Sequence, residues 1–171
     1  MPPALVSLTS SRLINAYGLL VCIVAMAAAL YLQHYQGLDP CPLCIFQRIA
    51  VIAAGLFFLI GLVFNPAGLW RRLWALLALA GSASGIGLAV RHIWLQGLPP
   101  EQVPACGPGL GYMFDVFPFM EMLDMVLNGS GECAEIDWTL WGITLPQLAL
   151  ATFAALAALA LVQLLRPQPA R

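Results

Sequence analysis

The fold is decided where a polar segment turns into a long apolar one, in the stretch Asp39-Pro40-Cys41-Pro42-Leu43-Cys44-Ile45-Phe46-Gln47-Arg48. Two cysteines separated by two residues lie at the expected start of a helix. The free backbone donors of a helix start favour negative charge, and the thiolate is the reactive form of cysteine. Cys44 is therefore placed to be reactive. If the helix begins near Cys44, Arg48 lies on the same face, where its guanidinium can reach whatever the sulfur faces.

Composition indicates a membrane protein. The chain has 171 residues, a mean hydropathy of +0.89 and only 9% charged residues. A typical soluble domain has about 25% charged residues. Seven arginines and no lysine stand beside eight acids, which gives no support to a nucleic-acid partner held by basic charge.

Four apolar runs are long enough to cross a bilayer, which requires about 20 mostly apolar residues. These runs are residues 14–32, 45–64, 73–90 and 146–165. We therefore expect an all-α, four-helix transmembrane bundle that residues 1–171 form as one domain, with outer loops at about 33–44 and 91–145. The first run could instead be a signal peptide cleaved near Ala27–Ala29, but its length favours a span.

The arginines predict the orientation of the bundle. Five of the seven lie on the side of the two termini, and arginine accumulates in cytoplasmic loops. These five are Arg12, Arg71, Arg72, Arg166 and Arg171. We expect cytoplasmic termini and four outward cysteines, Cys41, Cys44, Cys106 and Cys133. In a bacterial inner membrane, these cysteines would face the periplasm, where disulfides form and persist.

The long second outer loop is too apolar in its middle to be disordered. Acids are interspersed among these apolar residues, and the pattern predicts a short amphipathic helix over about 118–127. Such a helix could lie in the membrane interface or pack against the mouth of the bundle. In the third span, Gly81 and Gly85 have the small-xxx-small spacing that predicts close helix packing.

The spacing of Cys41 and Cys44 has three interpretations. A structural zinc site is disfavoured because it needs four ligands and the only spare histidines are His34 and His92. A static disulfide would close too short a loop to stabilise the chain much. An exchanging dithiol is the interpretation that this spacing favours. Cys22, inside an apolar run, is expected to pack as a small hydrophobe.

Cys106 and Cys133 lie in glycine-containing turns of the second outer loop. A plain structural bridge between them would contribute roughly 3 to 4.7 kcal/mol, and composition does not exclude it. Their flanking glycines and the second outward pair favour a relay of exchanging disulfides. Arg48 and Arg91-His92 lie at the outer ends of spans, where headgroup contact is the default role. The functional alternative is that they surround an electron acceptor, and Arg48 is the better candidate because of its fixed offset from Cys44.

These features together resemble the DsbB family of membrane thiol oxidases. The resemblance covers nearly the whole chain and includes four spans with paired cysteines in both outer loops. The matching motifs are Cys41-Pro42-Leu43-Cys44, Arg48, Cys106, Cys133-Ala134-Glu135, Trp138, Gly142 and Pro146. Gln47 stands where some relatives carry an acid.

The resemblance implies a protein-dithiol:quinone oxidoreductase. A disulfide between Cys106 and Cys133 would take electrons from a reduced soluble thioredoxin-like oxidase, DsbA, with Cys106 forming the mixed disulfide. Cys41 and Cys44 would reoxidise that pair and pass two electrons to a membrane quinone, ubiquinone or menaquinone.

The same resemblance assigns the quinone contacts. Cys44 would touch the ring, Arg48 would stabilise its reduced form, and His92 occupies a place close to a family histidine near the quinone. One alternative is a thiol oxidase with another partner, as in the vitamin K epoxide reductase group. The other is a non-catalytic membrane scaffold or metal-binding protein stapled by two disulfides.

Overall fold

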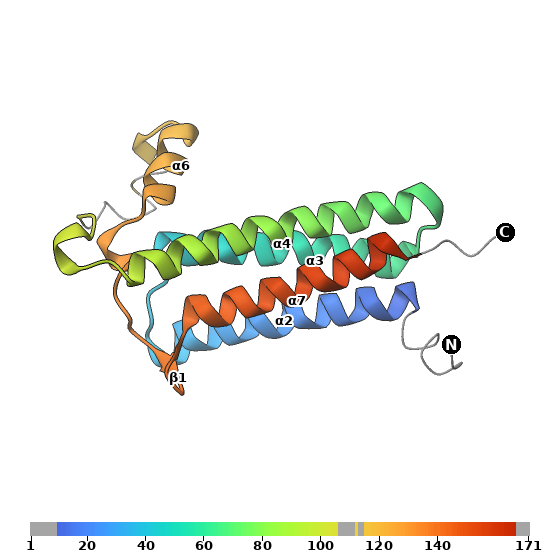
Figure 1. Ribbon diagram of the computed structural model, residues 1–171, viewed down its shortest axis with the longest axis horizontal. Coiled ribbons are helices and arrows are strands. Elements are labelled where there is room, and N and C mark those ends of the chain that lie inside the picture. The colour runs from blue at the N-terminus through green and yellow to red at the C-terminus, as the bar shows by residue number, and fades with distance from the viewer. Residues whose placement is uncertain (1–9, 106–111, 113–114, 167–171) are drawn as a thin grey trace.

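The computed structural model describes residues 10–105, 112 and 115–166. Four long helices run side by side and form an all-α bundle (Figure 1). They are α2 (Ser11–Gln36), α3 (Pro42–Phe64), α4 (Gly68–Gln96) and α7 (Leu145–Leu165). Each is long and apolar enough to cross a membrane, which confirms the predicted four-helix transmembrane fold. Helix α2 begins and α7 ends at the same end of the bundle (Figure 1).

The helices extend beyond the apolar runs that predicted them. Helix α4 takes in Arg71, Arg91 and His92, which were expected at or beyond its ends. Helix α3 begins at Pro42, two residues before Cys44. A proline is favourable at the first helical position because its missing N–H would have no partner there. Cys41 consequently becomes the N-cap, and Cys44 lies in the first turn.

Small residues let the helices approach closely. A Cβ added at Gly85 of α4 would lie 2.2 Å from the ring of Phe153 on α7, and one at Gly81 would lie 3.4 Å from the backbone of Ala54 on α3. In lipid, such close backbone approach supplies much of the packing between helices. The predicted role of these two glycines is thereby confirmed.

Cys22 belongs to the interior of the bundle. It is buried in a cluster with residues of α3, α4 and α7. Its side chain lies against Gly55, whose added Cβ would be 3.2 Å from the Cys22 Cβ. The prediction that Cys22 packs as a small hydrophobe is confirmed.

The short elements gather at the opposite end of the bundle from the start of α2 (Figure 1). They are η1 (Pro100–Gln102), α6 (Phe119–Asn128), η2 (Gly131–Cys133), β1 (Thr139–Leu140) and β2 (Ile143–Thr144). The two strands pair in an antiparallel hairpin. Trp141 and Gly142 have φ values of 50° and 85° in its two-residue turn, a conformation typical of tight hairpins.

Helix α6 occupies the position predicted for the short amphipathic helix. Its buried residues, Met122 and Val126, pack with Leu43 and Leu95 at the mouth of the bundle. Phe119 and Met120 are exposed. Its inner face therefore packs on the bundle, while contact with the membrane interface stays a prediction.

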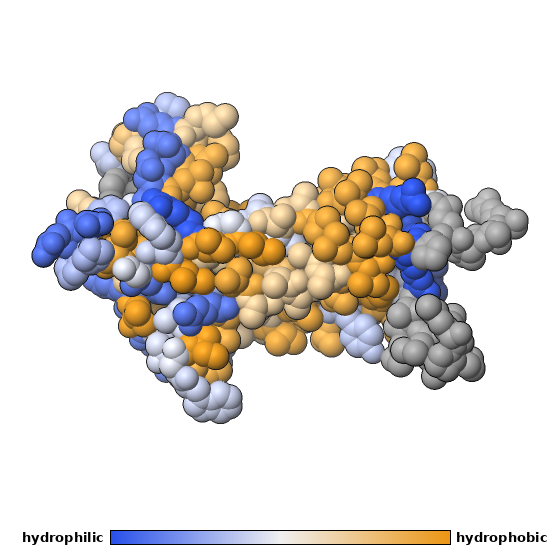
Figure 2. Space-filling view, in the orientation of Figure 1, coloured by the Kyte–Doolittle hydropathy of each residue, from blue (hydrophilic) through white to orange (hydrophobic). Residues whose placement is uncertain are grey.

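The surface supports the assignment of membrane spans. Figure 2 shows a hydrophobic band over the middle of the bundle, with hydrophilic residues concentrated towards its two ends. Ile52, Leu56 and Leu76 are among the large apolar side chains that are about half exposed along the helices. Such side chains can face lipid tails without any loss of hydrophobic stabilisation.

Replacing Gly85 with alanine tests the helix packing. We expect Gly85→Ala to destabilise the bundle by about 1–3 kcal/mol, because the new methyl group would overlap the buried ring of Phe153. Gly87→Ala is the matched control in the same helix, since nothing lies within 4 Å of an added Cβ there. It should be neutral or stabilise by up to about 1 kcal/mol. Thermal unfolding in detergent measures both, and equal midpoints for the two variants would contradict the packing.

Candidate active site

The first turn of α3 is built around the two neighbouring cysteines. The Cys41 sulfur takes the place of an N-cap oxygen and accepts a hydrogen bond from the backbone N–H of Cys44 at 3.4 Å. The Sγ atoms of Cys41 and Cys44 are 3.0 Å apart, and both residues are thiols. A disulfide requires about 2.05 Å, so small side-chain movements suffice to form one.

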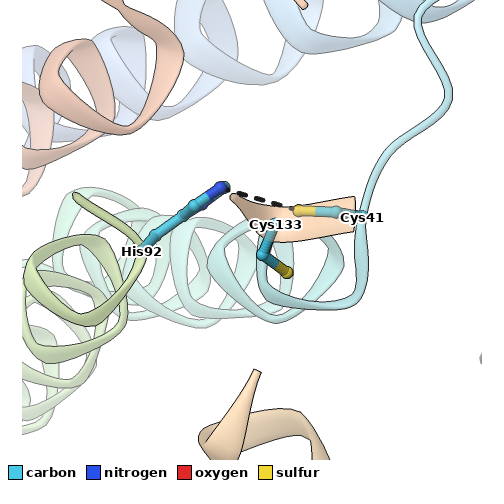
Figure 3. Close-up of side chains that lie close together, drawn as sticks. All are labelled: Cys41, His92 and Cys133. Atoms are coloured by element: carbon cyan, nitrogen blue, oxygen red, sulfur yellow. Dashed lines mark hydrogen bonds between the residues drawn. The ribbon is translucent and has the colours of Figure 1, made fainter. Parts of the chain in front are cut away.

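His92 of α4 lies beside both sulfurs. Its ring is buried, with Nε2 3.8 Å from Cys41 Sγ (Figure 3). Nδ1 lies 4.0 Å from Cys44 Sγ. The side-chain amide of Gln47 is 3.4 Å from Nδ1. The sequence placed His92 near the outer end of a span, and the family resemblance placed it near the quinone. The structure places it in direct contact with the dithiol.

Cys133 joins the same group from the second outer loop (Figure 3). The sulfurs of Cys41 and Cys133 and one ring nitrogen of His92 all lie within 4.8 Å of one another. Cys133 is fully buried, and its sulfur is 3.7 Å from the Ser130 hydroxyl. Cys41 of the first predicted cysteine pair therefore lies within reach of Cys133 of the second pair.

Cys41 and Cys133 are the two thiols of this group that lie outside the spans, and the neighbouring sulfur atoms shift their pKa values. The Cys133 thiol lowers the pKa of Cys41, but the Cys44 thiol and burial outweigh it and raise the pKa of Cys41 to about 12. The Cys41 sulfur and burial raise the pKa of Cys133 above the ordinary range for a cysteine. Both are therefore neutral thiols at pH 7, because desolvation and neighbouring negative charge disfavour the thiolate.

Cys106 lies outside the described residues. The chain just before it is described, and the backbone N–H of Gly131 donates to the carbonyl of Ala105 at 3.4 Å. The chain therefore enters the segment that contains Cys106 next to the turn that holds Cys133.

A cavity of about 350 Å³ opens beside the cysteines. Its walls are mostly apolar side chains from α2, α3 and α7, and Cys41, Cys44, Arg48 and His92 also line it. The principal apolar wall residues are Ala25, Met26, Leu32, Val51, Leu145 and Phe153. The cavity thus combines two thiols, a cation and an apolar wall, the features expected for an apolar ligand with a few polar atoms.

Arg48 is held in position by α2. Its guanidinium donates hydrogen bonds to Oε1 of Gln33 and to the carbonyl of Ala29, the latter at 3.2 Å. Arg48 and Cys44 both line the cavity. Gln33 was not anticipated, although an uncharged amide in the last turns of an apolar span is a signal that could have drawn attention to it.

Arg91 holds the end of α6 against α4. Its Nε and Nη2 donate to the carbonyls of Leu127 and Asn128, both at 2.9 Å, and its guanidinium lies 4.2 Å from the centre of the Trp94 ring. These bonds tie the end of α6 to α4, and Arg91 is not among the residues that line the cavity. Arg91 has these partners because the free carbonyls of a helix end attract its donors. A place beside an electron acceptor stays a prediction for Arg91.

Acidic residues complete the outer part of the cavity. Exposed carboxylates from both outer loops contribute to its lining. They are Asp39, Glu132, Glu135 and Asp137. The sequence did not indicate that the two outer loops meet around one opening.

A family model described as disulfide bond formation protein DsbB matches residues 11–163. The chain belongs to the DsbB family. Relatives named disulfide bond formation protein B include one from Chromohalobacter salexigens, which is 56% identical over 140 residues and 81% of each chain. One from Acinetobacter baylyi is 48% identical over 161 residues and 94% of each chain. One from Methylococcus capsulatus is 47% identical over 157 residues, which cover 92% of this chain and 96% of that relative. The predicted DsbB resemblance is thereby confirmed.

The acidity of Cys41 can be measured in this DsbB-family protein by alkylation. In the fully reduced protein, we expect the rate of Cys41 modification by iodoacetamide to rise about tenfold per pH unit between pH 7 and pH 10, because the thiolate is the reacting form and the pKa is about 12. Mass spectrometry of the peptide that contains Cys41 gives the rate. A short cysteine peptide is the control, and its rate should level off above its pKa of about 8.5. A Cys41 rate that levels off below pH 9 would contradict the raised pKa.

Proposed function

We propose that the chain is a protein-dithiol:quinone oxidoreductase, which reoxidises a soluble DsbA-like thiol oxidase and passes two electrons to ubiquinone or menaquinone in the membrane. One observation carries the proposal. The Cys133 sulfur lies beside the Cys41–Cys44 pair, and Cys44 lines an apolar cavity that also contains Arg48. The names of the relatives, which describe disulfide bond formation, support the same activity.

The relay starts with disulfides between Cys41 and Cys44 and between Cys106 and Cys133. A thiolate of the reduced partner attacks Cys106, forms a mixed disulfide and releases Cys133 as a thiolate. That thiolate attacks Cys41, which lies next to it, and releases Cys44 as a thiolate.

The remaining exchanges restore the disulfide between Cys106 and Cys133. The second thiol of the partner attacks the partner's own sulfur in the mixed disulfide. This forms the partner's disulfide and releases Cys106 as a thiolate. Cys106 then attacks Cys133 and frees Cys41. The net result is one new disulfide in the partner and a reduced Cys41–Cys44 dithiol, which holds the two electrons.

The residues around the cavity fit a quinone. The volume of about 350 Å³ and the apolar walls suit a small apolar ring, and the ring could arrive from the bilayer. When bound, a quinone accepts two electrons and two protons. Arg48, oriented by Gln33 and the Ala29 carbonyl, would hold the ring oxygen on which negative charge develops. His92 touches both sulfurs and lines the cavity, where its ring can carry a proton.

The same proposal includes a location and an orientation. We place the chain in the bacterial inner membrane as a multi-pass protein with cytoplasmic termini and periplasmic redox cysteines. The arginine distribution supports this orientation. The site also lies at the end of the bundle opposite the start of α2 and the end of α7 (Figure 1).

Turnover of serine variants tests the relay. We expect Cys44→Ser and Cys133→Ser to lower the rate at which a reduced DsbA-like protein reduces ubiquinone by more than about 1,000-fold, because each removes a sulfur that no other group replaces. Cys22→Ser is the matched control, since Cys22 lies in the helix packing and should leave the rate within about twofold. Quinone absorbance follows the reaction, and wild-type turnover in either active-site variant would refute the relay.

Arg48→Gln tests the cation at the cavity. We expect the apparent KM for quinone to rise about tenfold or more, with the cysteines still oxidisable by a chemical oxidant, because only the charge near the ring is lost. Arg72→Gln is the control, because Arg72 is exposed near the start of α4, at the far end of the bundle. An unchanged dependence on quinone concentration in Arg48→Gln would remove Arg48 from the site.

A further inference from the structure

Three atoms that can bind metal converge at the outer end of the bundle, and the Cys44 sulfur lies beside two of these residues. The sulfurs of Cys41 and Cys133 and a ring nitrogen of His92 lie within 4.8 Å of one another. Cys44 Sγ is 3.0 Å from Cys41 Sγ and 4.0 Å from the ring of His92. Cys41 and Cys44 come from the N-cap and first turn of α3, His92 from α4 and Cys133 from η2, so the fold creates the cluster from three separate parts of the chain. Figure 3 shows Cys41, His92 and Cys133 together.

We propose that the fully reduced chain binds one Zn²⁺ ion through Cys41, Cys44, Cys133 and His92. A tetrahedral zinc ion with sulfur at about 2.3 Å and nitrogen at about 2.0 Å places its ligand atoms about 3.5–3.8 Å apart. The Cys41 Sγ to His92 Nε2 distance is 3.8 Å, and the ligand atoms of Cys41, Cys133 and His92 all lie within 4.8 Å of one another. The Cys44 sulfur is 3.0 Å from Cys41 Sγ but faces Nδ1 at 4.0 Å, so its side chain must rotate the most to join the other three. Side-chain movement alone can therefore close the site around an ion.

The ligand set selects zinc by its chemistry. Three thiolates and one imidazole form the four-coordinate sulfur and nitrogen shell that zinc prefers, whereas calcium and magnesium require oxygen ligands. Gln47 supplies the outer support that a metal-binding histidine needs. The Gln47 amide nitrogen now lies 3.4 Å from Nδ1; when the amide turns over, its oxygen accepts from Nδ1–H and leaves Nε2, the atom nearer Cys41, free to bind the ion.

A cation can also reach the cluster. Cys41, Cys44 and His92 line the cavity, and four exposed carboxylates surround its outer part. These are Asp39, Glu132, Glu135 and Asp137. Their negative charge raises the local concentration of divalent cations at the opening.

Zinc binding and disulfide exchange exclude each other. Each sulfur binds zinc as a thiolate, so the three thiols release three protons as the ion enters, and no electron is transferred. A disulfide between Cys41 and Cys44 removes two of the four ligands. Zinc would therefore bind only the reduced chain and would hold the dithiol out of the relay until the ion is removed.

Chelator competition with ZnCl₂ on the purified full-length chain tests the site without any quinone or partner protein. After reduction with a phosphine, we expect one tightly bound Zn²⁺ per chain. Oxidation with diamide should weaken binding at least tenfold. Cd²⁺ in place of Zn²⁺ should produce the ultraviolet charge-transfer absorption of metal–thiolate bonds.

Single variants identify the ligands. Cys133→Ser and His92→Ala should each weaken Zn²⁺ binding by about tenfold or more, since loss of an outer-shell partner alone costs about 10–100-fold. Cys22→Ser and His34→Ala are the matched controls and should bind as the wild type does, since Cys22 lies in the helix packing. Circular dichroism confirms that each variant is folded, and His92→Gln replaces His92→Ala if the latter unfolds.

Two results would overturn the zinc site. One is the absence of stoichiometric Zn²⁺ binding to the reduced wild type. The other is wild-type affinity in folded Cys133→Ser and His92 variants. Neither result bears on the proposed quinone reduction, which is measured separately, and a failure of that activity would leave the zinc result unaffected.

Discussion

The site depends on the packing of the second outer loop against the mouth of the bundle. Leu43 and Leu95 are fully buried there, in one cluster with Met122, Val126 and Cys133. Each such apolar side chain contributes about 1.5–3 kcal/mol when it is removed from water. That burial holds the loop on the bundle and keeps the Cys133 sulfur beside Cys41, although the two residues are far apart in the sequence.

The start of α3 connects this packing to chemistry. In a membrane helix the free N–H groups of the first turn need partners, and the Cys41 sulfur is one such partner for Cys44. The sulfur that caps the helix is also the sulfur that meets Cys133. Arg48 lies one turn further along, held against α2 and lining the same cavity. In surroundings of low dielectric, a cation fixed in this way acts more strongly on a developing negative charge than water does.

The fold could be predicted because the bilayer permits few solutions. Spans of about 20 apolar residues are required, and each must satisfy its own backbone as a helix. The helix ends were less predictable. Helix α2 continues to Gln36 and α4 to Gln96, because helical hydrogen bonding persists past the last apolar residue of a run. The partners of Arg91 could not be predicted either, since they are backbone carbonyls at the end of α6, far from Arg91 in the sequence.

The sequence by itself determined the class of the protein, its four spans and the reactive spacing of Cys41 and Cys44, because these follow from local composition and from residues adjacent in the chain. Only the tertiary structure decided that His92 lies against the dithiol and that Cys133 lies beside Cys41. It also decided that acids of both outer loops surround one cavity. These contacts join distant segments, and the burial that creates them leaves no periodic pattern in the chain from which they could be read.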